Sequence, residues 1–572
     1  MCLTISDTEL KIHRHVVKVT KSSQLHNCLT INYVYFIVNQ FVNIKTKFRF
    51  KVNEIMIEKK LPDGTVVKAY PITSSQQMMY LMSLKYGSGY PVNNIGCGVY
   101  WKGEINKKEM KASIYEAIKR CDTMRLRFVM GKKLALHQYV TETSELVVED
   151  WDLSDKTIEE AQDTLLSFSR QVIPMFKCEV HRIFLVKFKD GYQGLFMRLH
   201  HLAMDAYSLK IFVNDIFEIY KHRTQGTAYP KPMKPYLPAL EKELAYETSA
   251  QHEADKQYWY DSLAKTSEPI FTDFMLDNRL KKQQKEFPDR RFADIHSGLP
   301  DADSVKFSMS KELSDKIYAL CAERNLSVFS VISMGVRTAL SCFNDNQEDV
   351  SFKMIINRRG TIEEKKSGGL RINFLPMRSI IKPEATFCEA VEEISAIQNE
   401  MYSHAKLSFL ETLKERHKSM SKEAKFDSTY DSFGLSYQPH VPFVSIDEEM
   451  KNSLRTVWYN NGATMIPLYL TVSHRPEDGG LNFNFEFRRE QQAAYDLSVF
   501  YSKMEKIFEF ATENPDIQVG KILKPIEITW KELKGKPPVE EAHSKTDAIK
   551  DKLTLGKSVL STISVLLKES LS

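Results

Sequence analysis

The segment that decides the fold of this chain reads LHHLAMDAYS over residues 199–208. It contains two adjacent histidines, and an aspartate stands four residues after the second. An apolar stretch typical of a strand precedes it over residues 194–199, and apolar residues spaced by three and four follow over residues 207–217, as in a helix. Because a histidine at a strand end can titrate near neutral pH and reach a substrate, the segment predicts a turn that presents such a group.

The same residues also fit a purely structural interpretation. Two adjacent histidines in a strand often comprise one buried and one exposed ring. An aspartate directly before a helix is most often its N-cap. The segment alone favours this second interpretation, so the decision depends on motifs elsewhere in the chain.

Six motifs in a fixed order, this one included, change that balance. The others are PITSSQQMMY at 71–80 with Gln76 at its core, RCDTMRLRF at 120–128, QYWYDSL at 257–263, NRR at 357–359 with GLRINFLP at 369–376, and FGLSYQ at 433–438. Together with HHxxxD they resemble the condensation domains of nonribosomal peptide synthetases, over about residues 70–514. Two positions depart from that family: Ala206 replaces a glycine and Cys121 replaces a histidine.

The resemblance implies an α/β (layered α+β) fold with two chloramphenicol-acetyltransferase-like lobes. The lobes are expected to form a V-shaped pseudo-dimer with a tunnel at their interface. We expect an N-terminal lobe over residues 56–235, a linker region over 236–300 and a C-terminal lobe over 301–530. Residues 531–572 are expected to form a linker and an amphipathic tail. Residues 1–55 lie outside the resemblance; they are either a genuine extension or translated sequence upstream of a true start at Met56.

Local patterns add detail to these lobes. Apolar runs over residues 181–188 and 194–200 on either side of a Lys-Asp-Gly turn predict a β-hairpin. Residues 241–263 predict one helix, and Ser310 is a suitable cap for a helix that follows it.

The resemblance also implies roles for the residues of the double-histidine motif. His201 is expected to face the tunnel, where it accepts the proton of an amine or positions the nucleophile. His200 is expected to point the other way and to be structural, since side chains alternate along a strand. Asp205 is expected to pair with an arginine, and Arg358 is the candidate because it directly follows a predicted strand.

Two further positions complete the predicted site. Asn373 matches a second-lobe asparagine of the family, and it either braces the lobe interface or caps a turn. Ala206 stands where the family has glycine. If that position requires a positive φ, alanine adds strain on the order of 1–2 kcal/mol.

Bulk properties exclude several classes of function. The formal charge of +5 reflects 79 basic against 74 acidic residues, without the clustered positive charge that nucleic-acid binding needs. The eight cysteines form no Cys-x-x-Cys pair, so we expect free thiols of a reducing compartment and no metal site. The apolar run over residues 29–44 contains four amide side chains and is a poor membrane span. These observations predict a cytoplasmic protein with no membrane span and no bound cofactor.

Three functions remain open. The leading hypothesis is a free-standing condensation enzyme of nonribosomal peptide or related secondary metabolism. It would act as a monomer and transfer an acyl group from the 4'-phosphopantetheine thioester of an acyl or peptidyl carrier protein to an amine. The second hypothesis is an O-acyltransferase that makes an ester from an alcohol and acyl-CoA or a carrier thioester. The third is a catalytically degenerate scaffold that docks carrier proteins, which Ala206 and Cys121 favour.

Overall fold

The structure is a computed structural model. It describes residues 56–526 except 88, 132–134, 177–178, 264–284, 286–299, 345, 418–432, 440–442 and 490–493. The predictions for residues 1–55 and for the tail over 531–572 lie outside the described residues.

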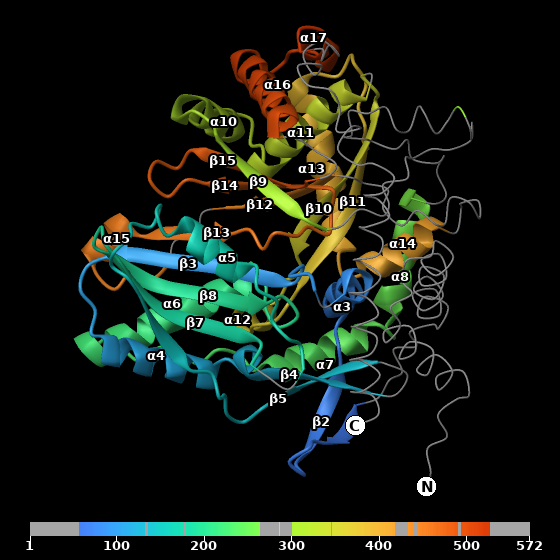
Figure 1. The fold of residues 1–572 in the computed structure, drawn as a ribbon. Coiled ribbons are helices and arrows are strands. Elements are labelled where there is room, and N and C mark those ends of the chain that lie inside the picture. The colour runs from blue at the N-terminus through green and yellow to red at the C-terminus, as the bar shows by residue number, and fades with distance from the viewer. Residues whose placement is uncertain are drawn as a thin grey trace, which may run out of the picture.

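The N-terminal lobe is built on a five-stranded sheet (Figure 1). Its strands, in spatial order, are β13 (Arg455–Tyr459), β3 (Asn94–Lys102), β8 (Tyr192–His200), β7 (His181–Phe188) and β6 (Val148–Leu153). One face, which includes Val99 and Met197, packs on α4 (Lys107–Arg120) and α6 (Ala206–Gln225). The alternate residues, such as Tyr100, pack toward α5 (Gln162–Ser169) on the other face. Both faces are covered because side chains alternate along each strand.

The predicted hairpin is confirmed. β7 and β8 pair antiparallel, with Phe184 opposite Phe196, and they are joined by a turn in which Gly191 has a φ of +79°. Glycine suits this turn because it adopts a positive φ without a steric penalty. The hairpin carries the chain to His200, the last residue of β8.

A smaller sheet and three helices lie beside this lobe. The sheet has the order β1 (Ile57–Lys60), β2 (Val66–Pro71), β5 (Leu136–Val140), β4 (Leu126–Met130), and the short 3-10 turn Asp122–Arg125 leads into β4. The helices are α3 (Ser74–Tyr86), α7 (Tyr236–Tyr246) and α8 (Ala250–Leu263). The single helix predicted over residues 241–263 is therefore wrong. The chain turns at residues 247–249, where the Ser249 hydroxyl accepts the N–H of His252 and caps α8.

The C-terminal lobe is built on a six-stranded sheet. Its strands, in spatial order, are β11 (Ile372–Ile380), β10 (Asp349–Asn357), β12 (Phe433–Gln438), β14 (Leu468–His474), β15 (Leu481–Arg488) and β9 (Ala302–Ser308). Its main helices are α10 (Lys311–Glu323), α11 (Val328–Phe343), α13 (Phe387–Ser403), α16 (Ala494–Glu513) and α17 (Val519–Leu523). Ser310 caps α10, as predicted, by accepting the N–H of Leu313. Short helices α12 (Ile362–Lys366), α14 (Phe409–His417) and α15 (Glu448–Ser453) connect the strands.

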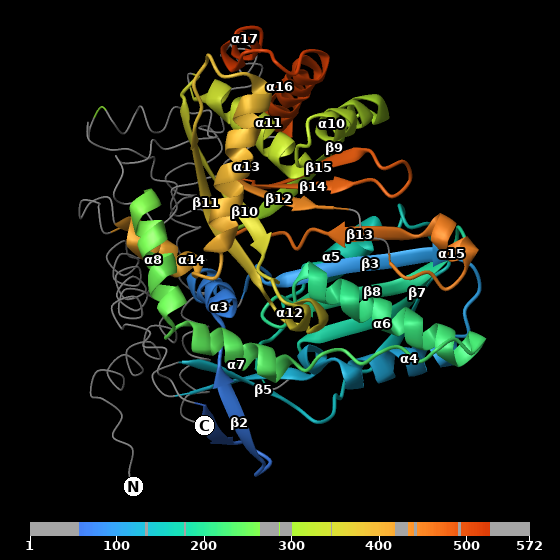
Figure 2. The same ribbon diagram turned by 180° about the vertical axis from the view of Figure 1, so that it is seen from behind.

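The two halves of the chain are interleaved, which the predicted boundaries did not include. β13 belongs by sequence to the second half, yet it pairs with β3 at the edge of the N-terminal sheet, with Val457 opposite Gly98. Figure 2 shows β13 lying beside β3, below the rest of the C-terminal sheet. A hydrophobic cluster also joins the halves: it contains Met79 of α3, Leu202 of the double-histidine motif and Phe374 of β11. The lobes therefore share backbone pairing and a core.

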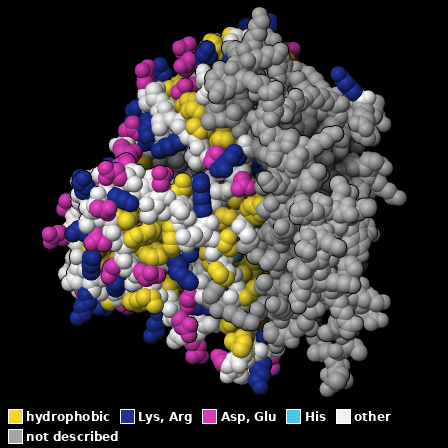
Figure 3. All heavy atoms as spheres, in the orientation of Figure 1, with side chains coloured by type: hydrophobic (Ala, Val, Ile, Leu, Met, Phe, Trp, Pro, Cys, Tyr) yellow, Lys and Arg dark blue, Asp and Glu magenta, His cyan; other side chains and the backbone are white. Residues whose placement is uncertain are grey.

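Charged side chains of both signs are interspersed over the described face in Figure 3. The five cysteines that the structure describes are buried thiols. Among the described residues no group of histidine, cysteine and acidic side chains could hold a metal ion. No single described helix is long and apolar enough to cross a membrane; α10 and α11 reach that length and composition only as a pair bent by 117°.

Candidate active site

The double-histidine motif forms the junction between β8 and α6. β8 ends at His200, and α6 begins at Ala206. Asp205 is the N-cap of α6: its extended backbone (φ −114°, ψ 176°) places Oδ1 2.9 Å from the backbone nitrogen of Ser208. The predicted sequence of strand, turn and helix is confirmed, and the N-cap interpretation of Asp205 is also correct.

His200 is buried within the sheet. Its Nδ1 accepts the N–H of Leu202 at 3.1 Å, and its backbone lies opposite Asn94 in β3. Burial lowers the pKa of His200 to about 3, with His201 and His181 as smaller causes. The ring is therefore neutral over the physiological range, and its hydrogen bond holds the turn that follows.

His201 is half-buried, and its backbone is fixed from the N-terminal lobe. Its N–H donates to the carbonyl of Asn93 at 2.7 Å. Burial lowers the pKa of His201, while the charge of Asp205 and the backbone groups of His201 and Met204 oppose this effect. Since the pKa lies below its ordinary value, the imidazole is neutral at neutral pH and can accept a proton.

Asp205 is paired with Arg359 and not with Arg358, so the predicted partner is wrong. Arg359 donates from Nη1 to Oδ2 of Asp205 at 2.8 Å and from Nη2 to Oδ1 at 3.0 Å. The two side chains are 1% and 2% exposed. Burial by itself would raise the pKa of Asp205, but Arg359 and the N–H groups of Ser208 and Arg371 hold it below its ordinary value. The pair is a buried, bidentate ion pair between the two halves of the chain.

Arg358 lies one residue earlier and points to a different partner. It donates to Oε1 of Glu243 and to the hydroxyl of Ser75, both at 2.7 Å. Glu243, on α7, also accepts from Arg371 at 3.1 Å. The two neighbouring arginines just after β10 therefore serve different partners, Arg358 bonding Glu243 and Arg359 bonding Asp205.

Ala206 fits its position without strain. It is the first residue of α6, and among the described residues other than glycine only Asn325 and Asn346 have a positive φ. The strain that a positive φ would have caused at Ala206 is therefore absent. Cys121, the second departure from the family pattern, is buried beside Thr123 with an Sγ to Oγ1 distance of 3.4 Å, and burial raises its pKa to about 11.

Asn373 ties β11 to the segment that leads into α14. Its Nδ2 donates to the carbonyls of Ala405 and Leu407 at 3.0 and 2.7 Å. Its Oδ1 accepts the N–H groups of Phe374 and Phe409 at 3.0 and 3.1 Å. Asn373 thus caps a turn, and because α14 packs against α3 and α8 it also supports the contact between the lobes.

Three residues of this arrangement were not among the predicted site residues: Asn93, Glu243 and Arg359. Arg359 lies in the NRR motif at 357–359, but nothing in that motif distinguishes it from Arg358 as the partner of Asp205. Asn93 and Glu243 act through contacts with segments more than a hundred residues away, for which the local sequence carries no periodic signal.

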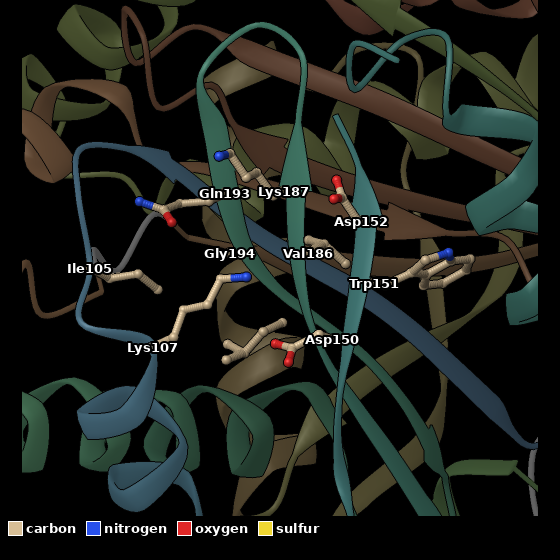
Figure 4. A pocket seen from close by; sticks show the side chains of 10 residues that line it. Ile105, Lys107, Asp150, Trp151, Asp152, Val186, Lys187, Gln193 and Gly194 are labelled. Carbon is tan, nitrogen blue, oxygen red and sulfur yellow. The ribbon is translucent and has the colours of Figure 1, made fainter. Parts of the chain in front are cut away.

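One pocket lies away from these residues (Figure 4). It is a hollow beside β6, β7 and β8 of about 310 Å³, open solvent included, with Lys107, Asp150, Asp152 and Lys187 among its lining residues. It contains none of the predicted site residues. The tunnel at the lobe interface remains a prediction.

Comparisons with known proteins agree with this architecture. A sequence model of the family described as Condensation domain matches residues 66–529. The chain is 20% identical over 462 residues to surfactin synthase subunit 1 of Bacillus subtilis, covering 79% of this chain and 12% of that protein. It is 25% identical over 350 residues to tyrocidine synthase 2 of Brevibacillus parabrevis, covering 59% of this chain and 9% of that protein. The chain thus spans only a small part of these relatives.

Solved structures show the same fold. The first condensation domain of the CDA synthetase superposes with a TM-score of 0.65 at 17% identity, covering 79% of this chain and 98% of that one. The condensation domain from Monacolin K polyketide synthase MokA superposes with a TM-score of 0.66 at 14% identity, covering 79% and 99%. These matches bear out the predicted chloramphenicol-acetyltransferase-like class.

Proposed function

Because this chain belongs to the condensation-domain family, we propose that it transfers an acyl group from a carrier-borne 4'-phosphopantetheine thioester to an amine and so forms an amide bond. The donor would be carried by an acyl or peptidyl carrier protein in nonribosomal peptide or related metabolism. The chain itself would act as a monomer, since its two lobes supply their own interface.

The observation that supports this proposal most directly is the state of His201. Its ring is half-buried and its backbone is held by Asn93. Its pKa is lowered by burial, so it is a neutral base at neutral pH. The adjoining Asp205 and Arg359 neutralise each other and fix the start of α6 directly after the histidine.

The proposed reaction needs one proton acceptor. The amine nitrogen attacks the thioester carbonyl carbon, and the nitrogen loses a proton to the imidazole of His201. The carbon–sulfur bond then breaks, and the thiolate takes that proton from the imidazolium. The products are an amide and a free pantetheine thiol. Holding donor and acceptor together contributes about 7–11 kcal/mol of the barrier reduction, independently of the base.

A second candidate differs in donor and nucleophile. An O-acyltransferase would use the same histidine to take the proton of an alcohol, with acyl-CoA as an alternative donor. One solved relative is a starter condensation domain of rhizomide synthetase in complex with C8-CoA, which keeps acyl-CoA among the donors to test. The scaffold hypothesis loses support, because Ala206 fits its helix and the set of His201, Asp205 and Arg359 is complete.

The test is an acyl-transfer assay followed by mass spectrometry. The full chain is incubated with acyl-pantetheine and acyl-CoA thioesters and a mixed set of amines and alcohols. His201→Ala is the test variant, and His222→Ala, in the last turn of α6, is the matched control. We expect an amide product that requires His201 but not His222. An ester product would support the second candidate, and product that persists in His201→Ala would contradict the proposed role of this residue.

A further inference from the structure

Two glutamines form a buried amide pair behind the His201 turn. Gln76, in the first turn of α3, and Gln138, in β5, are both 0% exposed. Gln76 donates from Nε2 to Oε1 of Gln138 at 2.8 Å, and Gln138 donates from Nε2 to Oε1 of Gln76 at 2.9 Å. Such a reciprocal pair satisfies one donor and one acceptor of each amide.

The remaining hydrogen-bonding positions of both amides are also used. Gln76 Nε2 donates to the carbonyl of Leu202 at 2.8 Å, and its Oε1 accepts the N–H of Thr73 at 2.8 Å. Gln138 Nε2 donates to the carbonyl of Pro71 at 3.0 Å, and its Oε1 accepts the hydroxyl of Tyr236 at 3.1 Å. Each side chain therefore makes two donations and two acceptances, the full capacity of a primary amide.

This saturation fixes the direction of both amides. Turning the Gln76 amide over would place an NH₂ group against the N–H of Thr73 and an oxygen against the carbonyl of Leu202. A buried polar group that loses its partner costs much more than a solvated one, so the alternative orientation is excluded. The donor that reaches Leu202 is consequently held in one place by β2, β5, α3 and α7.

Leu202 directly follows His201, and the peptide groups around the histidine are all restrained. The His201 N–H donates to Asn93, and the Leu202 N–H donates to Nδ1 of His200. The side chain of Asn93 in turn donates to the carbonyl of Met79 in α3 at 2.9 Å. On the C-terminal side of His201, the donation from Gln76 to the Leu202 carbonyl ties the backbone to the same helix, α3.

We propose that the buried pair of Gln76 and Gln138 is a positioning element that sets the orientation of the His201 imidazole for acyl transfer. The proposal rests on the proposed function for its effect on rate. Its effect on the histidine itself is independent of that function. Neither glutamine touches the reacting atoms; both act through the backbone at Leu202.

The variant Gln76→Glu removes the contact with Leu202 while keeping the size of the side chain. A glutamate keeps an oxygen for the N–H of Thr73 and is well suited to the third position of a capping box, so the start of α3 is preserved. An ionised glutamate has no N–H to donate, so the donations to the Leu202 carbonyl and to Oε1 of Gln138 are lost, whereas it can still accept from Nε2 of Gln138. The matched control is Gln398→Glu, because Gln398 is 3% exposed and bonds Ser330 and Ser333 at 2.7 and 2.9 Å in the core of the other lobe.

Two readouts are measured in each variant. The first is the rate at which diethyl pyrocarbonate modifies His201 as a function of pH, resolved by peptide mass spectrometry. The second is the split between kcat and KM for the thioester and the amine. We expect Gln76→Glu to change the His201 modification rate at least threefold and to lower kcat about tenfold to a hundredfold, with KM nearly unchanged. Gln398→Glu should change neither readout at equal folded fraction.

Further outcomes separate the two proposals. In a His201→Ala background, Gln76→Glu should lower the residual rate no further, because the residue it positions is absent. An unchanged His201 modification rate in Gln76→Glu, or an equal response in Gln398→Glu, would overturn the positioning role. If the wild-type chain transfers no acyl group, the proposed function fails while the modification rates still decide the positioning role. Gln138→Met repeats the test if Gln76→Glu does not fold.

Discussion

Replacing Arg359 with alanine tests whether the ion pair to Asp205 holds the two halves of the chain together. Besides Asp205, Arg359 donates to the hydroxyl of Ser208 at 2.7 Å, to the carbonyl of Gly369 at 2.8 Å and to Oδ1 of Asn357 at 2.8 Å. After its removal, the buried carboxylate of Asp205 keeps only two backbone N–H donors, those of Ser208 and Arg371, each at 2.9 Å.

The expected loss in the free energy of unfolding is about 3–5 kcal/mol, because a buried charge is left without its counterion. The matched control is Arg489→Ala. Arg489 also binds its carboxylate, that of Asp303, through two bonds, from Nε and Nη2 and both at 2.9 Å, but the side chains are 58% and 43% exposed. An exposed pair of this kind contributes about 0.2–1 kcal/mol. The comparison therefore tests whether burial, and not two-bond pairing by itself, determines the loss in the free energy of unfolding.

The assay is urea unfolding followed by circular dichroism, at pH 7 and at pH 5. The wild-type pKa of Asp205 is lowered by its partners, so the stability it contributes is present above the unfolded pKa and is lost as the pH falls through the folded pKa. In Arg359→Ala burial is no longer offset, the pKa rises above its unfolded value, and protonation at low pH stabilises the variant. The difference between wild type and Arg359→Ala should thus shrink as the pH falls. A loss equal to that of Arg489→Ala, or one independent of pH, would refute the argument.

Three further predictions follow from the same contacts. His181→Gln should make stability less dependent on pH on the acid side, because burial lowers the pKa of His181 to about 4. In the wild type, the free energy of unfolding should therefore fall by about 1.5 kcal/mol between pH 6.5 and pH 5 through this histidine. The difference in urea unfolding between wild type and variant measures this fall. Glu243→Gln should destabilise by about 2–3 kcal/mol because Arg358 and Arg371 lose a shared carboxylate, whereas Glu241→Gln, on the exposed side of α7, should cost less than about 1 kcal/mol in the same assay. Gly194→Ala should lower the melting temperature more than Gly191→Ala, because a Cβ at Gly194 would lie 2.1 Å from the carbonyl oxygen of Val99 in the paired strand, while at Gly191 the space is open and only backbone strain of about 1–2 kcal/mol at a φ of +79° is added.

Local sequence patterns predicted the elements that carry the site. The hairpin of β7 and β8 follows from apolar runs on both sides of a glycine turn, and α6 follows from apolar residues at helical spacing. The N-cap at Asp205 follows from an acidic residue at the start of that helix. These features depend on interactions within one or two turns of chain, which is the range over which a pattern can be read.

The partner of Asp205 and the place of β13 depend on contacts between residues that are far apart in the sequence. Arg358 and Arg359 both follow β10, and only the direction in which the backbone leaves the strand decides which of them faces Asp205. β13 has an ordinary strand composition, and nothing within it indicates that it pairs with β3, some 350 residues earlier in the chain. Gln138 likewise resembles the polar residue of a half-exposed strand, and only the approach of Gln76 gives it a partner.

The contacts around Asp205 constrain how substrates can approach His201. Asp205 caps α6, accepts from Arg359 and accepts from the N–H of Arg371, so the same carboxylate fixes the turn after His201 and joins it to the second half of the chain. Separating the lobes at this point would break the buried bidentate pair together with the bond from Arg359 to Ser208. β13 adds backbone pairing with β3 to the same restraint. For the proposed reaction we therefore expect donor and acceptor to reach His201 while the contact between Asp205 and Arg359 stays closed.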